Sequence, residues 1–131
     1  MAEDALVESL VADSLKLVEA LDGQDNTPSN VLWYFFPDAE QWCLLVAGQT
    51  FDRLLPRDGA KAYQVLARSI AAAKLNSLTI ADVKLVRTDD AVLVGTKSAI
   101  KTPPDRVVRA HFRESTFNGV YVKEMVVLRA A

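Results

Sequence analysis

The sequence predicts one α+β domain, residues 1–131, built from a mixed five-stranded sheet and about three helices in the order α-β-β-α-β-α-β-β. Three observations carry this prediction. Apolar residues recur at helical spacing near the N-terminus, two aromatic-rich runs flank a short polar turn, and Asn118-Gly119 separates two strand-like segments near the C-terminus. Half of the residues are hydrophobic, which is enough to bury a core without disulfides or metals.

The first segment reads as a helix from Glu3 to Leu21. Its apolar residues recur at intervals of three and four, so they form one broad stripe that faces the core. They are Leu6, Val7, Leu10, Val11, Leu17, Val18 and Leu21. Gly23 ends the helix, and the turn-rich residues that follow predict a loop.

The middle of the chain predicts two strands, a helix and a third strand. The runs "VLWYFFP" and "QWCLLVAG" read as strands joined at Pro37-Asp38-Ala39-Glu40. Asp58 is placed to cap a helix that continues to about Ala73. "ADVKLVR" then reads as the third strand.

The segment "TDDAVLVGTKSAIK" fits either a strand or a helix. We favour a helix behind a cap at Asp89 or Asp90, ended by the following "PPD". Two strands remain, about 106–115 and 120–129, and Asn-Gly between them is a strong hairpin signal because a type I′ turn needs positive φ at both central residues. If Phe117 faces Val120, then Arg113 lies opposite Glu124 and Glu114 lies opposite Lys123, which pairs opposite charges.

Residues 31–129 resemble a family of small bacterial proteins of unassigned function. The resemblance rests on "WYFFPDAEQWCLLVAG", "GAKAYQVLARSI", "DVKLVRTDD" and "NGVYVKEMVVLR" in this order. It implies the helix after Asp90 and the final hairpin. It transfers no catalytic residue.

Composition disfavours several classes of protein, among them membrane-inserted and disulfide-bonded proteins. There is no apolar run of eighteen residues, and the N-terminus is acidic, so we expect a cytoplasmic protein that is not inserted in a membrane. Cys43 stands alone in an apolar run and reads as a small buried hydrophobe. His111 is the only histidine, so the sequence has too few Cys and His residues for a common zinc site or a Cys/His nucleophile pair, and we expect no cofactor.

Charge is divided unevenly along the chain. Residues 1–56 carry ten acids and two bases, whereas residues 57–131 carry seven acids and thirteen bases. This asymmetry indicates either a nucleic-acid surface or internal complementarity, with the acidic first helix lying over a basic region. We favour internal complementarity.

One pattern points to an enzyme. Pro37-Asp38 followed by Asp82-Val83-Lys84 resembles the signature of metal-dependent nucleases, in which two carboxylates hold a divalent ion and a lysine helps to activate water. The competing interpretation is an ordinary turn residue and an ordinary strand start. A helix lies between the two halves of the pattern, which favours this second interpretation.

A second pattern points to nucleic acid. Arg109, His111 and Arg113 alternate on a predicted strand, so they share one face. A basic strip of this kind can contact phosphates, while its alternative role is a solvated or acid-paired face. In the hairpin register above, Tyr121 and Lys123 fall on the opposite face.

Five of the ten aromatic residues lie between positions 33 and 42. Most of them are expected in the core, yet Trp33, Phe35 and Trp42 are also the best candidates for an interaction surface. The sequence therefore favours a non-catalytic interaction or accessory module that binds a protein partner or forms a homodimer. A nucleic-acid-binding domain is the alternative, and a metal-dependent nuclease is the second alternative.

Overall fold

The computed structural model describes residue 6 and residues 8–131. Its α-helices are α1 (Glu8–Gly23), α2 (Gln49–Leu54), α3 (Gly59–Ala73) and α4 (Ala91–Ala99), with a 3-10 helix η2 (Ile80–Asp82). Its strands are β1 (Asn30–Phe36), β2 (Gln41–Ala47), β3 (Val83–Leu85), β4 (Ala110–Phe117) and β5 (Val120–Ala130).

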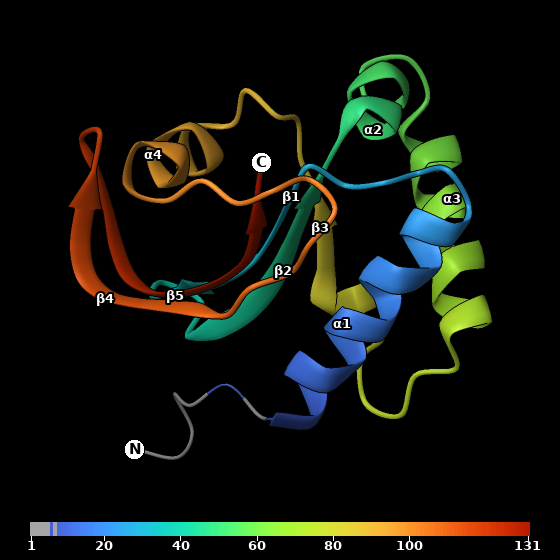
Figure 1. Ribbon diagram of the computed structural model, residues 1–131, viewed down its shortest axis with the longest axis horizontal. Helices are drawn as coiled ribbons and strands as arrows, with labels where there is room; N and C mark the ends of the chain where they lie inside the picture. Colours follow the sequence, from blue (N-terminus) through green and yellow to red (C-terminus); the bar gives the residue numbers. More distant parts are fainter. Residues whose placement is uncertain (1–5, 7) are drawn as a thin grey trace.

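The five strands form one mixed sheet in the order β3-β2-β1-β5-β4. β2 and β3 are parallel, and each of the other neighbouring pairs is antiparallel. The sheet is strongly curved, with α4 on one side and α1 and α3 on the other (Figure 1). β3 and β4 are the outer strands, and the chain passes between them through α4.

Strand alternation divides the apolar side chains between two cores. Val31 and Trp33 of β1 face the core under α1 and α3, which includes Leu17 and Leu66. The intervening β1 residues face the core under α4. This explains why β1 is apolar almost throughout, because a strand that is covered on both faces needs apolar residues at successive positions.

The predicted α+β class, the five-stranded sheet and the C-terminal hairpin are confirmed. The Asp58 and Asp90 carboxylates accept the N–H groups of Lys61 and Val92, as helix caps do. Leu93 of the ambiguous segment is fully buried in α4, so the helical interpretation of that segment is confirmed.

One additional helix and two strand boundaries differ from the prediction. α2, a short helix, follows β2 directly and was not expected. β3 is only three residues long. Thr79 and Asp82 form a capping box around η2, so the strand begins only after Asp82. β4 begins at Ala110 rather than near residue 106, although the Val108 N–H still donates to the Leu128 carbonyl at 2.7 Å.

The final hairpin turns at Asn118 and Gly119, which have φ values of 50° and 82°. Phe117 pairs with Val120 and Arg113 pairs with Glu124, as expected. The expected pair of Glu114 and Lys123 is missing from the ladder, because Glu114 takes a left-handed φ of 46°. The hairpin is therefore interrupted in its middle.

This interruption changes which face Lys123 uses. Val122 and Met125 both contribute to the core under α4, whereas strict alternation would place them on opposite faces. The Lys123 ammonium lies 5.2 Å from the centroid of the Phe35 ring, and Phe35 packs against Trp42 of the other core. The expectation that Lys123 faces away from the basic strip is thus wrong, and the cause is the backbone at Glu114.

Buried polar groups of α1 tie the helical layer to the rest of the fold. The Trp33 indole N–H donates to the Ser14 hydroxyl at 3.1 Å. The Asp13 carboxylate accepts three backbone N–H groups from residues 76–78 at 2.6–3.0 Å. Both residues lie on the helix face that packs inward. Within the described part of the chain, no helix has the length and apolar character needed to cross a membrane.

Candidate functional site

The three residues of the nuclease-like pattern lie near one end of the sheet. Asp38 is exposed in the β1–β2 turn, Asp82 closes η2, and Lys84 is the exposed middle residue of β3. The Asp82 carboxylate accepts the Thr79 N–H at 2.9 Å, which gives it a local structural role. Residue 6 and residues 8–131 contain no group of three or more His, Cys, Asp or Glu side chains that could hold a metal ion.

A recess lies between the start of β2 and the start of β3, and we call it the β2–β3 recess. It has a volume of about 270 Å³ and is lined by Phe36, Ala39, Gln41, Trp42, Cys43, Ala81 and Lys84. It exists because β3 begins at Val83 opposite Leu44, so residues 41–43 of β2 face η2 instead of a strand. Two sequence-predicted candidates, Trp42 and Lys84, therefore meet at one place.

The polar groups of the β2–β3 recess differ in character. The Lys84 ammonium lies 5.8 Å from the Phe36 ring centroid, and none of the ion pairs among the described residues involves it. Burial raises the pKa of the Cys43 thiol, while nearby Lys84 lowers it and Asp82 raises it. The thiol is therefore protonated near neutral pH, which disfavours a nucleophilic role.

The basic strip is paired with acids of the same chain. Arg109 forms a two-pronged ion pair with Glu8, with one N–O distance of 2.9 Å. The imidazole of His111 lies 2.7 Å from the Glu124 carboxylate, and the guanidinium of Arg113 lies 3.4 Å from the same carboxylate. The structure thus shows the acid-paired alternative for all three residues.

Acids of the N-terminal part of the chain form ion pairs with bases of the C-terminal part. Glu8 at the start of α1 binds Arg109, and Asp22 near its end binds the buried Arg129 at 3.1 Å. Both contacts join the acidic N-terminal helix to bases of the C-terminal part of the chain, Arg109 just before β4 and Arg129 in β5. The favoured interpretation of the charge pattern, internal complementarity, is confirmed by these two pairs.

The aromatic cluster divides between core and surface. Trp33 and Phe35 are each 1% exposed, so they do not form the interaction surface for which they were candidates. A strand covered on both faces buries its aromatic residues whichever way they point. Trp42 is half-buried and lines the β2–β3 recess. The described residues of the α1 stripe, such as Val11, Leu17 and Leu21, are likewise used in the core, and Leu15 beside the stripe is 38% exposed. Val7 of the predicted stripe lies outside the described residues.

Strand β4 has an outer edge that is not paired with another described strand. It is an outer strand of eight residues. The ion pairs of His111 and Arg113 reach Glu124 on β5, away from that edge. The opposite edge is different, because the Tyr63 hydroxyl of α3 accepts the Leu85 N–H of β3 at 3.1 Å.

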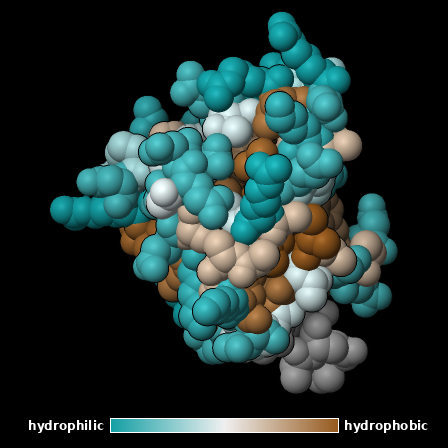
Figure 2. Space-filling model, turned by 90° about the vertical axis from the view of Figure 1, so that its right-hand side faces the viewer, coloured by the Kyte–Doolittle hydropathy of each residue, from teal (hydrophilic) through white to brown (hydrophobic). Residues whose placement is uncertain are grey.

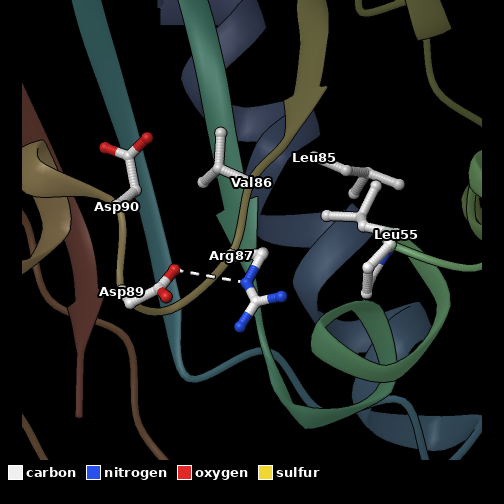
Figure 3. A pocket seen from close by; sticks show the side chains of 7 residues that line it. Leu55, Leu85, Val86, Arg87, Asp89 and Asp90 are labelled. Atoms are coloured by element: carbon white, nitrogen blue, oxygen red, sulfur yellow. Dashed lines mark hydrogen bonds and ion pairs between the residues drawn. The ribbon is translucent and has the colours of Figure 1, made fainter.

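A further cavity, of about 390 Å³, lies where α2 ends and β3 leads into α4. Leu55, Pro56, Leu85 and Val86 form its apolar wall, and Arg87, Asp89 and Asp90 its charged part. Figure 3 shows the Arg87 and Asp89 side chains turned toward one another, with an N–O distance of 3.3 Å. The two charges satisfy each other, and Asp90 caps α4.

The helical side of the molecule is partly apolar. Figure 2 shows hydrophobic surface between hydrophilic groups on this side. The half-buried Val65 and Ile70 of α3 belong to the core beneath it, and Ile80 of η2 is 42% exposed.

Comparison with known proteins gave no match: none was found among protein-family models, curated proteins or solved structures.

Sequence reasoning missed Asp13, Ser14 and Tyr63, which position the helices around the sheet. The sequence does contain a sign that Asp13 and Ser14 are buried, because both are polar residues beside the apolar stripe of the first helix. Their partners, residues 76–78 and Trp33, lie far away in the sequence, so no local pattern identifies them.

Proposed function

We propose that this chain is a non-catalytic interaction module that binds an extended segment of a partner protein at the outer edge of β4. The observation that carries the proposal is the open edge of this eight-residue strand. An outer strand presents unpaired N–H and C=O groups, to which another strand can be added.

The basic side chains of β4 point toward β5, so they leave the outer edge of β4 uncovered. His111 and Arg113 are held toward β5 by Glu124, so the backbone of residues 110–113 is left accessible. Glu114, with its left-handed backbone, interrupts the regular strand at that point. We infer that a partner strand pairs with residues 110–113 and not with the whole hairpin.

The partner is expected to be another protein rather than a second copy of this chain. In a symmetric antiparallel pair of β4 strands centred on Phe112, His111 would lie opposite the Arg113 of the second copy. This places basic side chains across from each other, which is unfavourable for cross-strand pairing. Self-association is the outcome to be tested against the main proposal.

The test uses two adjacent proline substitutions. Neighbouring residues of a strand direct their N–H groups to opposite edges, so only one of Ala110→Pro and His111→Pro removes an outward donor. The other removes a bond to β5 and lowers stability. His111→Ala controls for the loss of the Glu124 contact.

Peptides selected from an extended-peptide library against the native chain supply the ligand. We expect such a peptide to slow hydrogen exchange of β4 amides and to lose affinity for the stable proline variant. Peptides that protect no β4 amide would contradict the proposal. Concentration-dependent dimerisation in sedimentation velocity, abolished by the same proline, would identify a second copy as the occupant instead.

A further inference from the structure

We propose that the β2–β3 recess binds a small aromatic carboxylate. This ligand site is separate from the β4 edge, since β2 and β4 are not neighbours in the sheet. The proposal does not depend on how β4 is used.

The walls of the recess suit a flat apolar body. Phe36 and Trp42 supply aromatic surface, and Ala39 and Ala81 leave space between the β1–β2 turn and η2. Pockets for small ligands are mostly apolar and carry a few polar groups that fix the orientation. The volume of about 270 Å³ is just below the usual range of ligand pockets, which limits the ligand to a small molecule such as a single ring with its carboxylate.

The charged group of the recess selects an anion. Among the described residues that line the recess, Lys84 and Cys43 are the ionisable ones, and no ion pair of the described residues joins the Lys84 ammonium to a carboxylate. Asp82, the nearest acid in sequence, directs its carboxylate to the Thr79 N–H. A ligand carboxylate can therefore approach Lys84 without displacing an existing ion pair.

The test compares benzoate with benzamide, which has the same shape and no charge. Binding is followed by ¹H–¹⁵N chemical shifts of the full chain at residues 41–43 and 84. We expect saturable benzoate shifts confined to the recess, and benzamide binding at least about tenfold weaker, equivalent to about 1.4 kcal/mol.

Three variants decide the outcome. Lys84→Gln should weaken benzoate binding at least about tenfold, Ala81→Leu should fill the recess and abolish binding, and Lys61→Gln, which removes an exposed lysine of α3, should change nothing. Equal melting temperatures would show that each variant is folded. Unsaturated shifts, shifts elsewhere, or unchanged benzoate affinity in Lys84→Gln would overturn the proposal. If Ala81→Leu does not fold, the comparison of ligands on the native chain decides instead. Equal binding of benzoate and benzamide to the native chain would then overturn the proposal.

Discussion

Arg129 and Asp22 form a two-pronged ion pair that joins the last strand to the end of the first helix, with both N–O distances at 3.1 Å. The Arg129 side chain is 1% exposed and also donates to the carbonyls of Arg106 and Pro28. One guanidinium therefore holds four acceptors from three parts of the chain.

Replacing Arg129 with Met should destabilise the fold by about 3–5 kcal/mol, because Asp22 loses its partner and two carbonyls lose their donors. Urea unfolding of the variant measures this loss. Arg53→Met, which alters an exposed arginine of α2, is the matched control and should stay within about 0.5 kcal/mol of the native chain. A similar stability for both variants would contradict the role assigned to Arg129.

Asp13 should make stability depend on pH. Burial by itself raises the pKa of its carboxyl, but the N–H groups of Leu78, Ser77 and Asn76 hold the pKa below the ordinary value of 3.8. A lowered pKa in the folded state stabilises the fold above the unfolded pKa, and this contribution is lost as pH falls through the folded pKa.

Asp13→Asn should therefore be less stable than the native chain at pH 7, and the difference should shrink as pH falls below about 4. Thermal melts between pH 7 and pH 2.5 measure the two curves. Asp25→Asn, in the exposed loop after α1, is the control for general charge effects. Parallel curves for native and Asp13→Asn would show that this carboxyl does not supply the pH dependence.

Gly95 lets α4 pack closely on the final hairpin. A Cβ at this position would lie 2.8 Å from the Phe117 carbonyl oxygen, so Gly95→Ala should force the helix away and cost about 1–3 kcal/mol. Intrinsic propensity alone would favour Ala in a helix by about 1 kcal/mol. The sign of the stability change thus separates the two effects. Gly23→Ala, where nothing lies within 4 Å, should not destabilise the fold.

Gly119→Val should weaken the hairpin by about 1–2 kcal/mol, because Gly119 has a φ of 82° that a β-branched residue adopts only with strain. Chemical denaturation measures the loss. Asn118→Gly keeps the positive φ accessible and should be tolerated. Unchanged stability in Gly119→Val would mean that the turn conformation is not required.

The parts of the fold that could be predicted are those with local causes. Asn118-Gly119 fixes a turn by its own conformational preference, and Asp58 and Asp90 cap helices through N–H groups two or three residues away. The left-handed backbone at Glu114 has no such signal, because a glutamate rarely adopts that conformation. It was consequently missed, together with the face on which Lys123 lies.

The candidate ligand site was only partly visible in the sequence. Trp42 and Lys84 were both selected, but for unrelated reasons, and their meeting depends on the parallel pairing of β2 with β3. That pairing is made across α2 and α3, so it is a property of the topology rather than of either segment. The acids that pair with the basic strip could not be predicted either, since Glu8 is about one hundred residues from Arg109 in the sequence.

The position of β5 between β1 and β4 also sets the order in which the molecule can assemble. β1 pairs with β2 through a four-residue turn, but its other neighbour is β5, about ninety residues later in the chain. During synthesis the inner edge of β1 stays open until residue 130 has been made. The β1–β2 hairpin and the helices can form early, whereas closure of the sheet waits for its last strand, so the slow step of folding is expected to be insertion of β5.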